Sequence, residues 1–413
     1  MKLKDICEQV TDRISSEKIS LDEYVTTDCI LQNKAGRSIA ANLPPQKCNL
    51  TRYKKGDVLI ANIRPYLRKI WFADSDGGCS ADVLTFRAKN SHIPEFLYAL
   101  LMQDSFYDYV MKATKGSKMP RGDINHIMNF PLASDNLNEA RIGKLITAID
   151  EKISINRQIN RNLEELAKQI YDYWFVQFDF PNEEGKPYKS SGGKMVWNET
   201  LKREIPADWE VKSVNDIATS YRGVGYSAKD EKSSKDKNIV LILRGNNISN
   251  GHIVYDDNTV YVDKSFVSSE QEIKKYDVII TMSSGSKEHV GKSAMFLFDS
   301  PHSYGAFCNK LTPKKNYQFF LANYLHSEYF IKCIRQFASG TGINNLTNEH
   351  FSKTIFSFPP NKIISDFNMK VEKIYQQLGI FEQENMKLIS LRNSLLPLLM
   401  NGQVTLISCL SHD

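Results

Sequence analysis

The clearest hydrophobic pattern in the chain is a heptad seam that is apolar at both ends and polar in the middle. Steps of four and three residues give Ile142, Ile146, Ile149, Ile153, Asn156, Asn160, Leu163, Ala167 and Ile170. Such a/d spacing is typical of a helix packed along its length against another helix. The pattern predicts a long helix over residues 136–178, with its partner in the same chain or in another copy.

A second seam of the same kind lies near the end of the chain and predicts a helix over residues 361–402. Its members are Phe367, Val371, Ile374, Leu378, Phe381, Asn385, Leu388, Arg392 and Leu395. Two matching seams in one chain most simply pack on each other, and pseudo-twofold symmetry would make the pair antiparallel. Buried asparagine penalises slipped registers. Alternatively, Asn156, Asn160 and Asn385 lie at a hydrated edge of the interface.

Two shorter matches precede the seams in the same order. KKGDVLI from Lys54 recurs as KKYDVII from Lys274, and each predicts a basic turn that enters a buried strand. FLY from Phe96, followed by KGSKMPRGDI, matches FLA from Phe320, followed by SGTGINNLTNEHF. Matches that keep their order over such spacings indicate a duplicated chain.

The duplication predicts an α+β fold in which each of two strand-rich modules is followed by a long helix. The two helices then form an antiparallel coiled-coil spacer with pseudo-twofold symmetry. We expect modules at 1–135 and 206–360, helices at 136–178 and 361–402, a linker at 179–205 and a tail at 403–413. The linker is rich in Gly, Ser, Lys and Glu, which is typical of a loop or hairpin.

Composition narrows the class of protein. A chain of 413 residues can hold two or three domains. It has no apolar run of membrane-spanning length, and its start, MKLKDICEQV, has no apolar signal core, so we expect neither a membrane protein nor a secreted one. The seven cysteines are scattered without a C-x-x-C pair, which favours a reduced cytoplasmic location without zinc.

Catalytic signatures are missing from the sequence. Strand-like YDVIITM precedes GSKEHVGKS, but Gly285 and Gly291 enclose five residues where a phosphate-binding loop needs four. The matching stretch of the first module, ANIRPYLRKIWF, has no glycine. G-x-S-x-G, H-E-x-x-H and the Asn-Pro-Pro-aromatic motif of amino-methyltransferases are also absent. We therefore expect no catalytic residue, metal ion or cofactor in this chain.

Basic residues gather at predicted turns, often beside aromatic residues or glycine. Arginine can read guanine edges, while Lys, Ser and Asn hold phosphates. The DNA-binding candidates in the first module are Arg37, Arg64, Tyr66, Arg68, Lys69, Lys115, Lys118 and Arg121. In the second module they are Arg222, Tyr226, Arg244, Asn246, Ser284, Lys287, Lys292 and Arg335. Alternatively, any one of them belongs to a solvated surface loop. A net charge of only +5 suits a selective reader better than a polycation.

Several segments resemble the specificity subunit of type I restriction-modification systems, and the resemblance covers nearly the whole chain. They are LEELAKQIYDYWFVQFDFPNEEGKP, IPADWEVKSVNDIA, SGTGINNLTNEHFSKTIFSFPP and LRNSLLPLLMNGQV. The resemblance implies that each of two target-recognition domains reads half of a split site in double-stranded DNA. It also implies that the helices dock two modification (methyltransferase) subunits and, in complete complexes, restriction subunits.

On this resemblance, S-adenosylmethionine and ATP bind to the partner subunits, and the chain itself is non-catalytic. The recognition domains are the variable part of the family, so no base-reading residue transfers from it. KGSKMPRGDI in the first module also departs from the SGTGINNL type of turn. One alternative function is a coiled-coil adaptor whose modules bind protein. Another is a nuclease or methyltransferase in its own right, against which the missing motifs argue.

Overall fold

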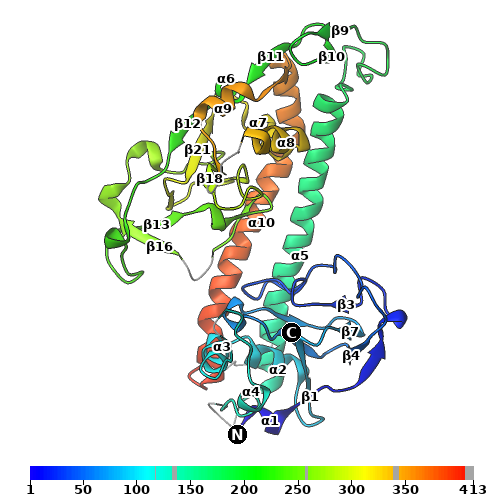
Figure 1. The fold of residues 1–413 in the computed structure, drawn as a ribbon, viewed down its shortest axis with the longest axis vertical. Helices are drawn as coiled ribbons and strands as arrows, with labels where there is room; N and C mark the ends of the chain where they lie inside the picture. The colour runs from blue at the N-terminus through cyan, green and yellow to red at the C-terminus, as the bar shows by residue number, and fades with distance from the viewer. Residues whose placement is uncertain (117, 133–136, 256–258, 338–343, 405–413) are drawn as a thin grey trace, which may run out of the picture. The chain divides into compact units, whose positions relative to one another are not determined.

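The computed structural model describes residues 1–116, 118–132, 137–255, 259–337 and 344–404. The chain divides into two compact units. Unit 1 comprises Met1–Gln158 and Gln383–Asp413, and unit 2 comprises Ile159–Glu382. Two long helices, α5 (Glu139–Tyr171) and α10 (Asn361–Met400), contribute a stretch to each unit (Figure 1). None of the described helices is long and apolar enough to cross a membrane.

Unit 1 contains two four-stranded sheets. The first has the order β1-β8-β5-β6 and is antiparallel, with strands Cys7–Gln9, Val83–Ala88, Val58–Ala61 and Ile70–Phe72. The second has the order β2-β4-β7-β3, with strands Arg13–Ser15, Asn49–Tyr53, Gly77–Cys79 and Tyr24–Val25. Short helices pack on the first sheet: α1 (Leu3–Ile6), α2 (Pro94–Leu101), α3 (Asp104–Met111) and α4 (Ile124–Ile127).

Unit 2 repeats the first sheet with the order β12-β21-β17-β19. Its strands are Ala218–Arg222, Cys308–Pro313, Val278–Thr281 and Ser293–Met295. The surrounding helices also recur in order as α6 (Val214–Ile217), α7 (Gln318–His326), α8 (Glu328–Phe337) and α9 (Asn348–Lys353). The structure therefore repeats one arrangement of helices and strands, as the duplicated sequence predicts.

The second sheet of unit 2 differs from its counterpart. It has three strands in the order β16-β13-β20, namely Val260–Asp263, Ile239–Leu243 and Ser303–Tyr304. Three further strand pairs belong to unit 2: β11 (Glu210–Ser213) with β23 (Ile355–Phe358), β14 (Ile248–Ser249) with β15 (His252–Ile253), and β18 (Ser283–Ser284) with β22 (Asn344–Asn345). The predicted linker contributes the hairpin of β9 (Met195–Asn198) and β10 (Arg203–Pro206). The first sheet thus has the same strand arrangement in both units, whereas the second sheet and the strands around it differ.

The repeated KKxD motif forms the same turn in both units. The backbone N–H of Lys54 donates to Asp57 Oδ2 at 2.8 Å, and the N–H of Lys274 donates to Asp277 Oδ2 at 2.8 Å. Each aspartate leads directly into a strand whose four residues are all buried, β5 and β17 respectively. The prediction of a basic turn entering a buried strand is confirmed in both copies.

The helix pair is antiparallel within unit 1. Asn156 Nδ2 of α5 donates to Asn385 Oδ1 of α10 at 3.0 Å, and Asp150, which lies earlier in α5, pairs with Arg392, which lies later in α10. Asn156 and Asn385 are 0% and 9% exposed, so a hydrated edge does not describe this pair. Asn160 is the residue that matches Asn385 in the repeat, and matching residues of an antiparallel pair do not face each other directly. Asn385 accordingly bonds Asn156 instead of Asn160.

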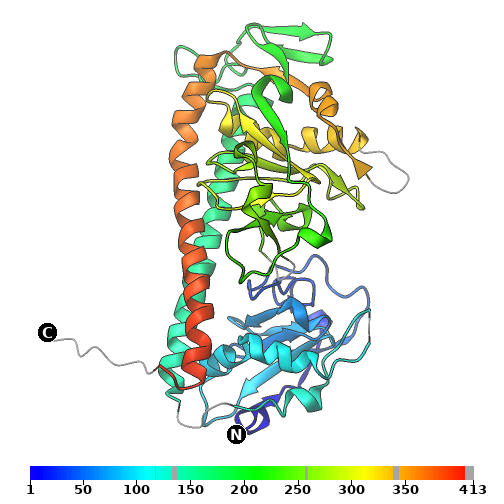
Figure 2. The ribbon, with the colours of Figure 1, turned by 90° about the vertical axis from the view of Figure 1, so that its left-hand side faces the viewer.

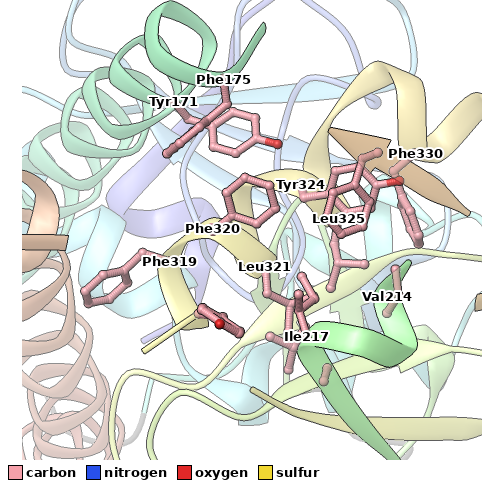
Figure 3. Packing of buried hydrophobic residues seen from close by; sticks show 14 of the residues in the cluster. Tyr171, Phe175, Val214, Ile217, Phe319, Phe320, Leu321, Tyr324, Leu325 and Phe330 are labelled. Carbon is pink, nitrogen blue, oxygen red and sulfur yellow. The ribbon is translucent and has the colours of Figure 1, made fainter. Parts of the chain in front are cut away.

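Within unit 2 the helices share an aromatic core. Phe175, in the π-helical turn Asp172–Val176 after α5, lies 4.8 Å from Phe367 of α10 and 5.0 Å from Phe320 of α7 between ring centroids. Figure 3 shows Phe320 between the rings of Tyr171 and Phe175 on one side and Tyr324 on the other. Aromatic packing of this kind adds to the burial of area, and it fixes α7 against both long helices.

The seam residues that we predicted from the heptads lie inside or partly inside their own units. Within each unit the stretches of the two helices lie side by side in two views (Figure 1, Figure 2). The buried seam residues are Ile142, Ile146, Ile149, Ile153, Asn156, Asn160, Ala167, Phe367, Val371, Leu378, Asn385 and Arg392. The partly buried ones are Leu163, Ile170, Ile374, Phe381, Leu388 and Leu395.

A histidine joins a short hairpin to both helices in unit 2. His252 of β15 has its Nε2 3.3 Å from Glu164 Oε1 of α5 and its Nδ1 3.5 Å from Glu382 Oε1 of α10. The bonds to Glu164 and Glu382 raise the pKa of His252 to about 10. The imidazolium is therefore the native form at neutral pH, and it holds the hairpin against the helix pair.

The stabilisation from His252 should depend on pH with a definite sign. Because the folded-state pKa is raised, this stabilisation is fully present below about pH 6.5, the range of a free histidine, and is lost as the pH rises through about 10. We expect the difference in Tm between wild type and His252→Gln to shrink steadily over that window. Solvent reduces its size, because the three side chains are 31–39% exposed. Thermal unfolding at pH 6, 8 and 10 measures it, and a difference that does not change with pH would exclude the charged clamp.

Candidate nucleic-acid interface

Two of the predicted basic clusters in unit 1 lie on adjoining loops. The loop after β5 carries Arg64, and the loop before α4 carries Arg121. The N–H of Arg64 donates to the carbonyl oxygen of Pro120 at 2.8 Å, and the N–H of Gly122 donates to Asn62 Oδ1 at 3.0 Å. Residues some 60 positions apart in the chain therefore form one surface at the end of the first sheet.

The loop after β5 has an unusual backbone. Arg64 and Arg68 both have left-handed conformations, with φ of 54° and 49°, and they flank the 3-10 turn Pro65–Leu67. Left-handed non-glycine residues cost on the order of 1 kcal/mol and cluster at ligand-binding sites. Here the conformation turns the loop outward, since Arg64 and Tyr66 are exposed.

Three candidates of unit 1 have internal roles. The guanidinium of Arg37 lies 4.2 Å from the centre of the Trp71 ring and donates to the carbonyl oxygen of Asp22. Arg68 pairs with Asp104 at 3.4 Å. Lys69 Nζ donates to the carbonyl oxygen of Thr27 at 2.5 Å, and burial lowers the pKa of Lys69. These contacts hold the loop in place, so Arg37, Arg68 and Lys69 support the surface from within.

The other basic candidates of unit 1 reach solvent. Lys115, Lys118 and Arg121 are exposed. Lys115 Nζ lies 2.9 Å from Asp123 Oδ2, and Arg121 Nε lies 3.3 Å from Asp82 Oδ1. Exposed ion pairs contribute little stability, so these cations can exchange their carboxylate partners for phosphates at small cost.

Unit 2 brings equivalent segments together. The N–H of Met282, after β17, donates to the carbonyl oxygen of Phe307 at 2.9 Å, and the N–H of Leu346 donates to the carbonyl oxygen of Met282 at 2.7 Å. Ser284 of β18 pairs with Asn344 of β22. The predicted SGTGINNL turn enters this surface only from Asn344, because residues 338–343 lie outside the described residues. Ser117 in the first module also lies outside them.

The candidates of unit 2 surround this loop. Arg222, Asn246 and Lys287 are exposed, whereas Tyr226, Arg244, Ser284, Lys292 and Arg335 are partly exposed. A Cβ added to Gly245 would lie 2.9 Å from Thr281 Cγ2, so the Arg244 turn abuts the end of β17. Arg335 Nη2 of α8 donates to the carbonyl oxygen of Glu288 at 3.3 Å.

Tyr226 and Arg244 belong to the same patch. Burial raises the pKa of Tyr226, and the nearby charge of Arg244 opposes that rise. Although the candidates come from four separate stretches of the chain, the structure thus gathers most of them around the end of β17.

Sequence reasoning missed one part of both surfaces, namely the turns at 80–82 and 305–307. Asp82 belongs to the Arg121 pair, and Phe307 is 68% exposed beside the loop after β17. The signal was present in the repeat, because SADVLTF from Ser80 and GAFCNKL from Gly305 occupy matching places before β8 and β21. Neither stretch contains a basic residue at the turn, so a search for cations passed over both.

The structure thus combines a duplicated α+β scaffold, basic loops in each unit and two paired helices. The family model of the type I restriction modification DNA specificity domain matches residues 1–165 and 206–391. This chain belongs to that family, and its role is DNA-sequence specificity without catalysis.

Individual relatives agree with this assignment. The specificity subunit of the HindI type I restriction enzyme of Haemophilus influenzae is 25% identical, over 97% of this chain and 98% of that protein. The EcoKI specificity subunit of Escherichia coli is 32% identical over 210 residues, which span 49% of this chain and 44% of that protein. The crystal structure of the type I restriction-modification S subunit from M. genitalium covers 99% of this chain and 96% of that one, with a TM-score of 0.54 and 13% identity. That likeness shows that this chain has the same fold as a solved structure.

Proposed function

We propose that this chain reads a bipartite site in double-stranded DNA, with one half-site recognised by each unit. The observation that carries the proposal is a shared scaffold with different loops. In unit 1 the loop after β5 is bonded to the segment before α4, and in unit 2 the loop after β17 is bonded to the segment before α9. Unit 1 has Arg64, Pro65 and Tyr66 in that loop, whereas unit 2 has Ser284, Gly285 and Lys287. Equivalent loops of different chemistry suit two different half-sites.

The residues divide by the contacts they can make. Arg64 and Arg121 of unit 1 and Arg222 of unit 2 are exposed guanidiniums that can bond a guanine edge through two donors. Lys115, Lys118 and Lys287 are exposed ammonium groups suited to phosphates, which fix register without reading sequence. In this proposal residues 1–135 and 206–360 are the two target-recognition domains.

We further propose that the long helices dock two modification subunits and that restriction subunits join the complete complex. Apolar side chains exposed on helix surfaces mark protein contacts when they lie together. On α5 and α10 those of unit 1 are Ile155, Met386, Leu391 and Leu398, and those of unit 2 are Leu166, Met369 and Ile380. Methyl transfer from S-adenosylmethionine and ATP hydrolysis then belong to the partners, and the complex works in the cytoplasm beside its DNA.

Mapping methylated bases in the host genome tests the proposal. We expect a two-part motif with an unspecified gap, methylated in the parent strain and unmethylated when the gene for this chain is deleted. Complementation with the intact gene should restore it. Identical methylation in both strains, with the modification subunit present in each, would reject the proposal and favour a protein-binding adaptor.

A further inference from the structure

In each unit the last residue of the same tight turn reaches the surface, with the side chain of Asp82 partly exposed and Phe307 68% exposed. In unit 1 the turn Ser80-Ala81-Asp82 enters β8, and in unit 2 the turn Gly305-Ala306-Phe307 enters β21. β8 and β21 occupy the same position in the two repeated sheets (Figure 1 labels β21). The residues at the tip differ completely, being a carboxylate in one unit and an aromatic ring in the other.

Backbone hydrogen bonds establish that the two turns are equivalent. The N–H of Ser80 donates to the carbonyl oxygen of Val25 at 2.9 Å, and the N–H of Gly305 donates to that of Leu243 at 2.8 Å. Each turn is closed by a second bond, from Val83 to Ser80 at 3.0 Å and from Cys308 to Gly305 at 2.8 Å.

A third pair of bonds ties each tip to the proposed recognition loop. The carbonyl oxygen of Asp82 accepts from the N–H of Asn62 at 2.8 Å, and that of Phe307 accepts from the N–H of Met282 at 2.9 Å. Asp82 and Phe307 therefore lie at the same place in their units, next to the first residue of the loop after β5 in unit 1 and of the loop after β17 in unit 2.

The backbone of Phe307 is held firmly although its side chain faces solvent. Its carbonyl oxygen also accepts from the N–H of Ser283 at 3.2 Å, and the N–H of Ala306 donates to the carbonyl oxygen of Val224 at 2.9 Å. A Cβ added to Gly223 would lie 2.2 Å from the carbonyl oxygen of Gly305, so the neighbouring segment packs closely against the turn. Because the side chain of Phe307 is 68% exposed, a partner that covers its ring removes a large apolar area from water and so gains binding free energy.

The surroundings of Phe307 indicate which partner covers it. An isolated exposed apolar residue needs no explanation. Phe307, however, is bonded through its backbone to the start of the loop that carries Ser284, Lys287 and Lys292, and its turn is bonded to the segment before Tyr226. A ring amid phosphate-binding chemistry is suited to the one apolar group that a DNA groove displays, the 5-methyl of thymine.

Asp82 offers the complementary chemistry in unit 1. A carboxylate near DNA is repelled by phosphates and by base acceptors, so it is tolerated only where it meets a donor. Cytosine N4 is such a donor in the major groove. Arg121, whose Nε lies 3.3 Å from Asp82 Oδ1, partly balances the charge of the carboxylate.

We propose that positions 82 and 307 are specificity-determining, with Phe307 contacting a thymine methyl in one half-site and Asp82 accepting from a cytosine amino group in the other. This rests on the proposed function, because it assumes that each unit reads duplex DNA. It adds to that function two residues outside the basic clusters and the class of base that each prefers.

The test uses the full chain with its modification subunit and a duplex that carries the two-part sequence motif found by methylation mapping. The affinity of the wild type is measured with each thymine of the motif replaced in turn by deoxyuridine, which lacks the methyl. We expect one replacement to weaken binding about fourfold, the value of one buried methyl group. Phe307→Ala should bind the intact motif about tenfold more weakly and be insensitive to that replacement, whereas Phe307→Leu should retain much of the sensitivity.

A matched control and the partner position complete the design. The control residue is Phe266 of unit 2, which is 40% exposed. It lies two residues after Lys264, whose N–H donates to the carbonyl oxygen of Asn238, at the opposite end of β13 from the turn that carries Phe307. Phe266→Ala should therefore bind like the wild type. Asp82→Asn should relax the preference for one cytosine in the other half-site and leave the thymine effect intact. The Tm of each variant reports whether it folds.

The outcomes separate the two claims. If the wild type selects its motif and Phe307→Ala, folded, shows the same affinity and the same deoxyuridine sensitivity, the inference is wrong and the proposed function stands. If the wild type shows no preference for the motif over unrelated duplex, the proposed function fails first. A deoxyuridine effect that disappears only in Phe307→Ala supports the thymine contact.

Discussion

Replacing Arg392 with methionine is expected to lower the free energy of unfolding by about 3–5 kcal/mol, the cost of leaving a buried charge without its partner. Arg392 is 3% exposed, although it occupies a seam position of α10 where an apolar residue is usual. Its guanidinium pairs with Asp150 of α5, and the hydroxyl of Tyr98 in α2 donates to the other oxygen of Asp150 at 2.5 Å. Without Arg392 the carboxylate keeps only the tyrosine. A loss of this size is a large part of a typical protein's stability.

Denaturant unfolding of a double-mutant cycle measures this network. Asp150→Leu alone should also destabilise the protein, whereas Asp150→Leu combined with Arg392→Met should recover most of the loss, because the whole ion pair is then apolar. Tyr98→Phe removes one hydrogen bond to a charged carboxylate and should cost about 1.5–3 kcal/mol. Additive single effects would mean that the two charges do not depend on each other, contrary to the geometry.

Raising the salt concentration from about 50 to 200 mM should weaken duplex binding by about a thousandfold or more. The recognition loops carry exposed cations in both units, among them Arg64, Lys115, Lys118, Arg222 and Lys287. Six phosphate contacts give a slope of about −5 in a plot of log affinity against log salt concentration. Lys287→Ala should make the slope shallower by about one and weaken all sequences alike.

The control for the salt effect is Lys202→Ala. Lys202 lies between the strands of the β9–β10 hairpin and pairs with Glu199 at 2.9 Å, away from the recognition loops in the sequence. Its removal should leave the slope unchanged. Binding that is insensitive to salt in the wild type would show that these cations do not contact phosphates.

Much of the fold could be predicted because the chain repeats itself. The seams have the heptad period, and the KKxD turns begin buried strands in both units, so pattern and duplication support each other. The antiparallel pairing also followed, since pseudo-twofold symmetry between the two copies makes the helices antiparallel, and the bond from Asn156 to Asn385 agrees with it.

The sites were harder to predict because tertiary contacts decide which cations remain at the surface. Arg37 looked like Arg64 in the sequence, yet the ring of Trp71 and the carbonyl of Asp22 engage it inside unit 1. The charged clamp at His252 needs Glu164 and Glu382, which are far from it in the chain. Phe307 gave no signal in a search for basic residues, and only the repeated turn geometry shows that it matches Asp82.

The central claim is that each unit reads its own half-site, and methylation mapping with variants of one unit at a time tests it most directly. Strains that express Arg64→Ala or Arg121→Ala carry a change in unit 1, and strains that express Arg222→Ala or Arg244→Ala carry one in unit 2. We expect the first pair to relax or abolish one half of the methylated motif and the second pair to affect only the other half. A lost bidentate base contact costs about 1–3 kcal/mol, enough to change which sites are modified. Variants of a single unit that alter both halves equally, or folded variants of both units that alter neither, would contradict the account.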